Sequence, residues 1–335
     1  MRSELNAIIS KYVEVFGYVS TTTYKKERSK LELNDHFDDY SFLDDYKTII
    51  TLAIPYPSKE VKWKGKGYGI LSRYSYGIDY HIVFKEILSK ITTEIEKLSI
   101  NSYSSVDISH IDERYAGFLS GIGYLGHNQF LINREYGSYF YLATILIDCE
   151  ITDIKQVYDD CGSCQACIEA CPSSALENGF NKDLCISNVS QSKKELSLNE
   201  IEHFKTMIYG CDICQKVCPK NKGIDIHKYM EFEPSGIENI SLEKLLKMSN
   251  KEFKGIYGSN ACSWKGARVI KRNALCLIAN QKLHGFRQQI TESMAENDEV
   301  LWYNKTAQKV LDLLDGEWLD ESCSFISSRD SSKYR

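Results

Sequence analysis

The sequence has little proline, no long apolar run and no excess of basic residues. Only 5 of the 335 residues are proline, and no low-complexity tract is present, which argues against long disordered stretches. No window approaches the roughly 20 apolar residues that span a bilayer. The formal net charge is −5, so a whole-molecule basic field for non-specific nucleic-acid binding is excluded, although a local basic patch is not.

The N-terminal sequence also lacks the features of an export signal. Residues 1–20 have the amphipathic spacing of a helix, but they contain no unbroken apolar core, no small-residue cleavage site and no twin-arginine pair. We therefore expect a cytoplasmic protein with no membrane contact. The length predicts two or three domains rather than one.

Cysteine, in contrast, is abundant: the chain has 12, and most of them lie between residues 161 and 218. In a cytosolic chain, clustered cysteines are more often metal ligands than disulfides. Residues 161–172 read CGSCQACIEACP, the C-x2-C-x2-C-x3-C-P run of bacterial ferredoxins. Residues 211–219 read CDICQKVCP, a copy with one cysteine fewer. Cys185 lies between the two copies and can supply the missing ligand.

The cysteine spacing predicts two [4Fe–4S] clusters with crossed ligation, as in two-cluster ferredoxins. The expected ligands of cluster one are Cys161, Cys164, Cys167 and Cys218. The expected ligands of cluster two are Cys171, Cys185, Cys211 and Cys214. Zinc is the alternative interpretation, but zinc favours two separate C-x2-C pairs, and a triple run that ends in Cys-Pro is a poor zinc pattern. Two clusters transfer electrons, so the flanking residues must supply the rest of the function.

The residues before the cysteines predict an α/β domain over residues 1–154. Residues 46–56 and 138–150 are apolar and β-branched, which is typical of buried strands. Residues 79–99 have apolar side chains three and four apart, which predicts a long amphipathic helix. Residues 121–128, GIGYLGHN, have G-x-G-x-x-G spacing, but the sequence before them favours a helix rather than a strand. A glycine loop that approaches some other bulky cofactor is therefore favoured over a dinucleotide loop.

Two further regions follow the α/β domain. Residues 155–235 predict a ferredoxin-like two-cluster domain, and residues 236–325 predict an all-α region of paired, HEAT-like helices. The expected helix over residues 264–281 carries a basic stripe at i, i+3 and i+7. Its members are Lys265, Arg268 and Arg272. Such a stripe is either a solvated helix face or a phosphate-contacting surface, and the residues alone do not decide between the two.

The chain resembles the epoxyqueuosine reductases, the cobalamin-dependent iron–sulfur enzymes that complete queuosine in tRNA. The similarity extends from about residue 40 to about residue 285. Besides both cysteine groups, it includes RYSYGIDYH (73–81), VDISHIDERYAGFLSGIGYLGHN (106–128), GSYFYLATILID (137–148), DLCIS (183–187) and WKGARVIKRNAL (264–275). The cysteines alone would indicate only a ferredoxin-like unit, and the flanking segments make the resemblance specific.

The resemblance implies a two-electron reduction of an epoxide to an alkene with loss of water. The N-terminal domain would hold cobalamin, and the clusters would feed it electrons from an external low-potential donor. The basic stripe would help to bind a tRNA with a queuosine-type anticodon. The leaving oxygen needs a proton, and the family's aspartate in this role corresponds to Asp107, seven residues before Arg114. Without the resemblance, Asp107 would be interpreted as an N-cap or turn residue.

The resemblance also gives a set of expected corrin contacts, and we expect a monomer. These contacts are His127, Asn128, Ser138, Cys211 and Asp212. His127 stands where the family usually has lysine, and the residues after Cys185, ISNVSQSK, differ from the usual tyrosine-containing stretch. Two other functions therefore stay open. One is a cobalamin and iron–sulfur reductase for another substrate, similar to the reductive dehalogenases, and the other is an electron-transfer or corrinoid-activating protein.

Overall fold

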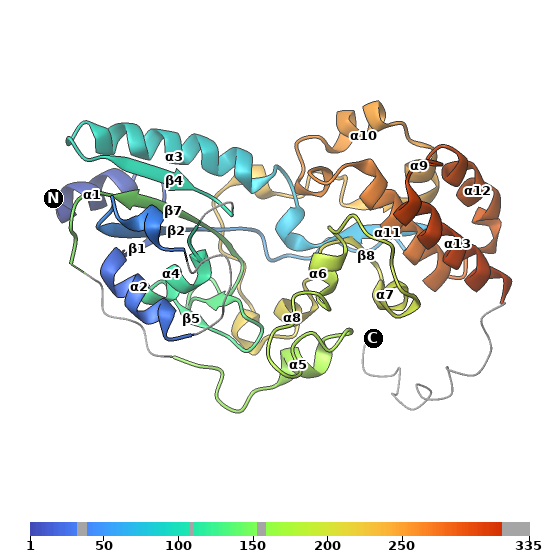
Figure 1. The fold of residues 1–335 in the computed structure, drawn as a ribbon, viewed down its shortest axis with the longest axis horizontal. Helices are drawn as coiled ribbons and strands as arrows, with labels where there is room; N and C mark the ends of the chain where they lie inside the picture. The colour runs from blue at the N-terminus through green and yellow to red at the C-terminus, as the bar shows by residue number, and fades with distance from the viewer. Residues whose placement is uncertain (32–38, 108–109, 153–158, 317–335) are drawn as a thin grey trace.

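An antiparallel four-stranded sheet forms the centre of the N-terminal part of the computed structural model, which describes residues 1–31, 39–107, 110–152 and 159–316 (Figure 1). In spatial order its strands are β1 (Val15–Ser20), β2 (Thr48–Pro55), β7 (Phe140–Ile147) and β4 (Ser102–Ser105). The two strands expected over residues 46–56 and 138–150 are thus confirmed. They are the inner pair of the sheet, which explains why their sequences are apolar almost throughout.

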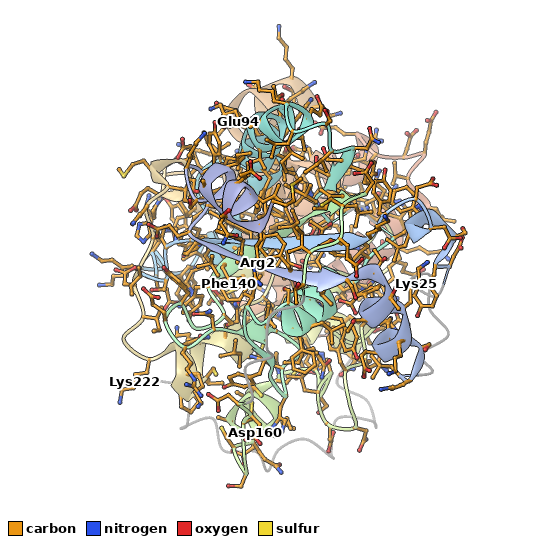
Figure 2. The ribbon with its side chains drawn as sticks, turned by 90° about the vertical axis from the view of Figure 1, so that its left-hand side faces the viewer. Arg2, Lys25, Glu94, Phe140, Asp160 and Lys222 are labelled. Atoms are coloured by element: carbon orange, nitrogen blue, oxygen red, sulfur yellow. The ribbon has the colours of Figure 1, made fainter. Side chains whose placement is uncertain are left out.

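Helices cover both faces of this sheet. They are α1 (Arg2–Ile9) and α3 (Tyr80–Glu96) on one face, and α2 (Thr21–Ser29) and α4 (Glu113–Leu119) on the other. Because side chains alternate along a strand, Ile50 and Leu52 of β2 pack with α1 and α3, whereas Ile49 packs with α2 and α4. In Figure 2, Glu94 of α3 and Asp160 of the cysteine-rich region lie at opposite ends of the view.

The G-x-G-x-x-G segment includes a glycine that the packing of this chain requires. It follows helix α4, as expected, and leads into a hairpin of β5 (Tyr124–Leu125) and β6 (Leu131–Ile132). A Cβ on Gly123 would lie 2.3 Å from the carbonyl oxygen of Ile132. Gly123 is needed for this close backbone approach within the hairpin, while a cofactor contact by this loop stays a prediction.

A second, three-stranded sheet joins the three expected regions. Its order is β8–β3–β9, and its strands are β3 (Tyr68–Leu71), β8 (Met207–Tyr209) and β9 (Asn239–Ser241). β3 pairs parallel with β8 and antiparallel with β9. The C-terminal region is therefore not all-α, because it begins with β9. The expected boundary between residues 154 and 155 lies outside the described residues.

Short helices follow in the cysteine-rich and C-terminal regions. In the cysteine-rich region they are α5 (Ala166–Ala170), α6 (Ile186–Val189), α7 (Leu198–His203) and α8 (Ile213–Lys216). In the C-terminal region they are α9 (Leu242–Lys247), α10 (Asn250–Tyr257), α11 (Ala267–Asn280), α12 (Arg287–Ala295) and α13 (Leu301–Asp315). Helices α9 and α10 are separate, because Ser249 forms a capping box with Glu252 and is the N-cap of α10.

Helix α11 is the centre of the C-terminal region. It contacts α7, α9, α13 and β8, and most of its side chains are buried. The remaining short elements are 3₁₀ turns: η2 (Ser41–Leu43), η3 (Arg73–Ser75), η4 (Pro219–Asn221), η5 (Met230–Phe232), η6 (Ala261–Ser263) and η7 (His284–Phe286). Across the described part of the chain, every helix is too short or too polar to span a membrane.

The turn between β8 and the second cysteine group requires a glycine. Gly210 has φ +71° and donates its backbone N–H to Ser190 Oγ at 3.0 Å. An added Cβ would lie 2.0 Å from Ser72 Oγ. We expect Gly210→Ala to lower the free energy of unfolding by about 2–4 kcal/mol, since it combines backbone strain with overpacking. A urea titration measures this loss.

Gly179→Ala is the matched control. Gly179 also has a positive φ, +86°, but nothing lies within 4 Å of an added Cβ. This variant should lose only the cost of backbone strain, roughly 1 kcal/mol. Equal losses in the two variants would contradict the steric explanation for Gly210.

Candidate functional site

Four cysteines from the two cysteine groups line one pocket. They are Cys161, Cys164, Cys167 and Cys218, and the other lining residues are His127, Asn128, Ile132 and Pro219. The first three lie before and within α5, whereas Cys218 directly precedes η4. Helices α5 and α8 contact each other, which brings these distant parts of the sequence together.

The remaining four cysteines of this region, Cys171, Cys185, Cys211 and Cys214, form a second group. Burial, together with the nearby thiols of Cys185 and Cys171, raises the pKa of Cys211 to about 12. Burial also raises the pKa of Cys214 well above its ordinary value, and the thiols of Cys211, Cys185 and Cys171 add to this effect. The Cys167 thiol of the first group also raises the pKa of Cys214, so the second group lies next to the first.

Neither group has the spacing of a single-ion site. Within the residues that the structure describes, no set of three or more His, Cys, Asp or Glu side chains is placed to hold one metal ion. Four thiolates around a zinc ion would each lie about 2.3 Å from it. Thiols arranged around a cavity suit a polyatomic iron–sulfur cluster better, because cysteines bind such a cluster at its separate iron atoms.

His127 and Asn128 contact the cysteine loops. His127 is exposed, and its Nδ1 lies 2.9 Å from the carbonyl oxygen of Cys164. Asn128 is buried, and its Nδ2 donates to the carbonyl oxygen of Cys214 at 3.5 Å. The two side chains therefore connect the β5–β6 hairpin to both cysteine groups.

Ser138 belongs to a buried polar network. Its backbone N–H donates to Asn221 Oδ1 at 2.8 Å, and its Oγ accepts from Asn221 Nδ2 at 2.9 Å. Its carbonyl oxygen accepts from Gln215 Nε2 at 2.9 Å. Contrary to expectation, the Ser138 hydroxyl is therefore not free to contact a cofactor. It fixes the residues before β7 to α8 and η4.

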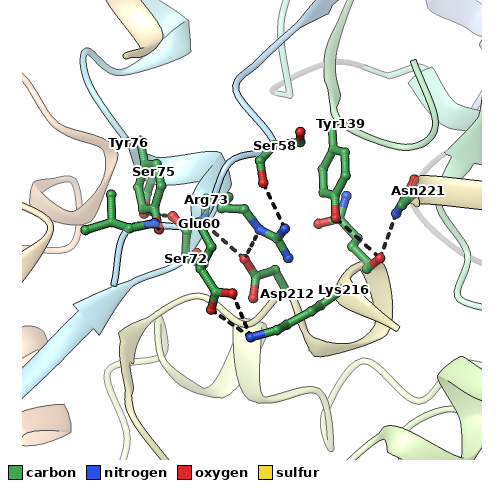
Figure 3. Close-up of polar contacts among 12 residues, drawn as sticks. Ser58, Glu60, Ser72, Arg73, Ser75, Tyr76, Tyr139, Asp212, Lys216 and Asn221 are labelled. Atoms are coloured by element: carbon green, nitrogen blue, oxygen red, sulfur yellow. Dashed lines mark hydrogen bonds and ion pairs between the residues drawn. The ribbon is translucent and has the colours of Figure 1, made fainter. Parts of the chain in front are cut away.

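Asp212 forms a buried ion pair with Arg73 of η3 (Figure 3). Asp212 Oδ2 accepts from Arg73 Nε at 2.8 Å and from the Arg73 backbone N–H at 3.2 Å. Arg73 also donates to the carbonyl oxygen of Ser58 at 3.0 Å, and its guanidinium lies 4.9 Å from the centre of the Tyr139 ring. The pair thus joins the second cysteine group to the segment after β3.

Each member of this ion pair keeps one unused polar atom. Arg73 Nη2 and Asp212 Oδ1 are buried and have no hydrogen-bond partner among the described residues. Arg73 lines an open cleft of about 340 Å³, whose other lining residues are Ser58, Lys59, Tyr139, Lys216, Asn221, Gly223, Ile224 and Asp225. Buried polar groups usually have partners, so the two unused atoms mark this ion pair as unusual; of the two residues, only Arg73 reaches the cleft.

Asp107 follows β4 in an unusual backbone conformation. Its φ is +56°, a region that Asp and Asn enter more readily than most residues. It is not an N-cap, because Asp112 caps α4. Its side chain is 48% exposed, and its Oδ2 accepts a hydrogen bond from the Tyr80 hydroxyl. Its backbone N–H donates to Glu113 Oε1 at 3.0 Å.

Aromatic residues connect the surroundings of Asp107 to the second cysteine group and to the start of α11. The charge of Asp107 adds to burial in raising the pKa of Tyr74. Gln191 Nε2 donates to the Tyr74 hydroxyl at 3.3 Å, and Gln191 Oε1 accepts from Trp264 Nε1 at 3.0 Å. Gln191 Nε2 also donates to the carbonyl oxygen of Ser187, two residues after Cys185, at 3.1 Å. Trp264 is 57% exposed.

The basic stripe divides into buried and exposed members. Arg272 is 0% exposed, and its guanidinium donates to the carbonyl oxygens of residues 189, 192 and 194. The prediction that Arg272 contacts tRNA is therefore wrong, because α11 is packed on several sides. Arg268 is exposed and donates to Asn297 Oδ1 at 2.9 Å. Lys265 Nζ lies 3.5 Å from the centre of the Trp264 ring.

Sequence reasoning did not single out Tyr80, His81 and Glu113, which all contact Asp107. His81 Nε2 lies 3.4 Å from Asp107 Oδ2. The signal was present in the segment RYSYGIDYH, which places two polar aromatic residues at the first turn of α3, and in the acidic neighbour of Arg114. Only the fold shows that these residues and Asp107 meet.

Two family models match the chain: the 4Fe-4S double cluster binding domain over residues 160–221, and Epoxyqueuosine reductase QueG over residues 38–108. An epoxyqueuosine reductase of Lactococcus garvieae is 37% identical over 264 residues, which cover 76% of this chain and 75% of that protein. The chain belongs to the epoxyqueuosine reductase family. The Bacillus subtilis epoxyqueuosine reductase is 36% identical over 310 residues, or 84% of this chain and 79% of that protein. The match to the Bacillus anthracis member covers 66% of its length.

Solved structures of epoxyqueuosine reductases have the same fold. One contains a tRNA-Tyr epoxyqueuosine-modified tRNA stem loop; it matches with a TM-score of 0.81 and 27% identity, over 94% of this chain and 98% of that chain. The Streptococcus thermophilus structure matches with a TM-score of 0.82 and 29% identity, over 94% and 90%. The double-cluster family model supports two [4Fe–4S] clusters in the cysteine-rich region of this chain.

Proposed function

We propose that this protein reduces epoxyqueuosine to queuosine in tRNA. One observation carries the proposal: the Asp107 charge reaches Tyr74, whose hydroxyl accepts from Gln191. Gln191 also contacts Ser187, two residues after Cys185, and the exposed Trp264. The fold matches a reductase with an epoxyqueuosine-modified tRNA stem loop. In the reaction an epoxide takes up two electrons and two protons, loses both C–O bonds and gives an alkene and water.

The two clusters supply the electrons. We assign cluster one to Cys161, Cys164, Cys167 and Cys218. We assign cluster two to Cys171, Cys185, Cys211 and Cys214. Gln191 contacts both Tyr74 and Ser187, two residues after Cys185, and the charge of Asp107 reaches Tyr74, which supports cluster two as the nearer cluster to the substrate. Electrons from an external low-potential donor would then pass from cluster one to cluster two.

We also propose cobalamin as the cofactor that cluster two reduces. The Cys211–Asp212 turn was expected to contact the corrin, and Arg73, the ion-pair partner of Asp212, lines a polar open cleft that supports this proposal. When bound, cobalamin supplies a low-potential metal centre for chemistry at carbon. His127 and Asn128 support the cysteine loops, so their contribution to cofactor binding would be indirect.

Asp107 is the group that we propose gives a proton to the leaving oxygen. The stacked rings of Tyr80 and Tyr141, with centres 4.4 Å apart, position the hydroxyl that contacts its carboxylate. Glu113 fixes its backbone. A solved Bacillus subtilis structure, which matches with a TM-score of 0.79, is described with its aspartate catalytic loop swung out of the active site. That description supports a loop aspartate as the proton donor here.

Asp107→Asn tests the function and the acid together. Asn tolerates the same positive φ, so the loop should keep its shape while the acid is lost. In the protein with both clusters and cobalamin, under anaerobic reduction, kcat on epoxyqueuosine tRNA should fall about 10²–10⁴-fold with unchanged tRNA affinity. Mass spectrometry of the nucleosides measures loss of one oxygen. Wild-type protein that holds both clusters and a corrin but leaves the nucleoside unchanged would refute the proposed function.

Paired cysteine variants test the ligand assignment. Cys164→Ala and Cys214→Ala should each reduce the iron content from about eight to about four per chain. Their combination should abolish it, whereas Cys185→Ala combined with Cys214→Ala should keep about four. Cys149→Ser, outside both groups, should retain full iron. Four irons in the Cys164→Ala, Cys214→Ala double variant would show that the two cysteines share a cluster.

Arg268→Gln should affect tRNA binding, whereas Arg272→Gln should affect the stability of the fold. Arg268 is exposed, so its loss should weaken tRNA binding and lower the slope of log K against log salt by about one. Arg272 is buried, so its loss should lower the free energy of unfolding by roughly 2–4 kcal/mol. Filter binding at several salt concentrations and urea titration measure the two effects. A salt slope that Arg268→Gln leaves unchanged would place the tRNA elsewhere.

A further inference from the structure

The proposed reaction needs two protons at one oxygen, whereas Asp107 carries at most one. Breaking the first C–O bond of the epoxide leaves an oxygen that takes the first proton and becomes a hydroxyl group. Breaking the second C–O bond forms the alkene, and the oxygen leaves as water after it takes the second proton. Two electrons enter at carbon over the two steps. Asp107 must therefore be protonated again within each turnover.

His81 connects Asp107 to a second carboxylate. His81 Nε2 lies 3.4 Å from Asp107 Oδ2, and His81 Nδ1 lies 2.8 Å from Asp79 Oδ1. Asp79 also accepts the backbone N–H of His81 at 3.0 Å and is the N-cap of α3, so its carboxylate is fixed. The three side chains form a continuous chain, Asp79–His81–Asp107, that ends at the proposed proton donor.

We propose that His81 is the proton store of the site and replaces each proton that Asp107 gives to the substrate. The Nε2 proton of His81 moves to Asp107 Oδ2, and solvent recharges the imidazole, which is 40% exposed. Asp79 is a positioning residue that keeps the proton on Nδ1 and directs Nε2 toward Asp107. This inference rests on the proposed function, because it concerns the same reaction at the same carboxylate.

The groups around His81 favour its positive charge. Burial lowers the pKa of His81, but hydrogen bonds with Asp107 and Asp79 outweigh this effect and raise the pKa to about 10. The ring of Tyr80 lies against it, with centres 4.3 Å apart. Glu113 faces Asp107 from α4, and burial and the Asp107 charge raise its pKa. The imidazolium is therefore available throughout the neutral range.

His81→Gln is the first test, because glutamine keeps polar contacts but holds no transferable charge. In the protein with clusters and cobalamin, kcat on epoxyqueuosine tRNA should fall about 10–100-fold, with unchanged KM and iron content. Imidazole added to His81→Ala should restore part of the rate. A residue with a merely structural role would not give such rescue.

The pH profile provides the second test. Wild-type kcat should stay level through neutral pH and fall as the pH rises through the pKa of His81. In Asp79→Asn the fall should begin at lower pH, because one of the two anions that raise this pKa is gone. Lys85→Gln, on the exposed side of α3, is the matched control and should leave the rate and the profile unchanged.

The outcomes separate this inference from the proposed function. If wild-type protein leaves the nucleoside unchanged, the proposed function itself fails. If wild-type protein is active and His81→Gln has the same kcat at every pH, the proton store is refuted while the function stands. Loss of rate in His81→Gln without imidazole rescue of His81→Ala, and without a shift in Asp79→Asn, would also overturn it, because His81 would then be only structural.

Discussion

The buried ion pair between Arg73 and Asp212 is the contact on which the rest of the site depends. Arg73 precedes Tyr74, which lies near Asp107, and Asp212 follows Cys211 of the second cysteine group. One interaction therefore fixes the residues proposed for proton transfer relative to the cysteines proposed to hold the clusters. Breaking a buried pair leaves an uncompensated charge and typically costs about 3–5 kcal/mol. The pair is thus a strong constraint on the distance between the two parts of the site, whatever it contributes to net stability.

Neutral polar groups support this ion pair from β7 and η4. Gln215 and Asn221 both hydrogen-bond to Ser138, and the Tyr139 ring packs against the Arg73 guanidinium. Because these amides and hydroxyls satisfy one another, the network adds no further buried charge beside the pair. The consequence is a rigid junction between the central sheet and the cysteine-rich region. The second sheet adds to this junction, because β3, β8 and β9 come from the N-terminal, cysteine-rich and C-terminal regions.

The sequence indicated the two-cluster region, which the double-cluster family model supports, because most of these cysteines follow one another at short, regular spacing. The assignment of each cysteine to a cluster stays a prediction. It also predicted the inner strands and the long helix, whose apolar patterns are strong. It failed at Arg272, because helical periodicity gives a stripe but does not say that α11 is packed on several sides. It also missed His81, since the contact between α3 and the residue after β4 depends on how the chain folds over the sheet. Contacts between distant segments have no periodic signature.

Protons and electrons impose opposite requirements on this site, and the structure separates them. Proton transfer needs contact with water, and Asp107 and His81 are each about half exposed. Electron transfer to a low-potential centre needs protection from water, and Cys211, Cys214 and the Arg73–Asp212 pair are largely enclosed. The Tyr74 hydroxyl accepts from Gln191, which also contacts Ser187 after Cys185, and the charge of Asp107 adds to burial in raising the pKa of Tyr74. A substrate at this boundary would receive electrons from the enclosed side and protons from the open side, so the routes of electrons and protons to the substrate would be separate.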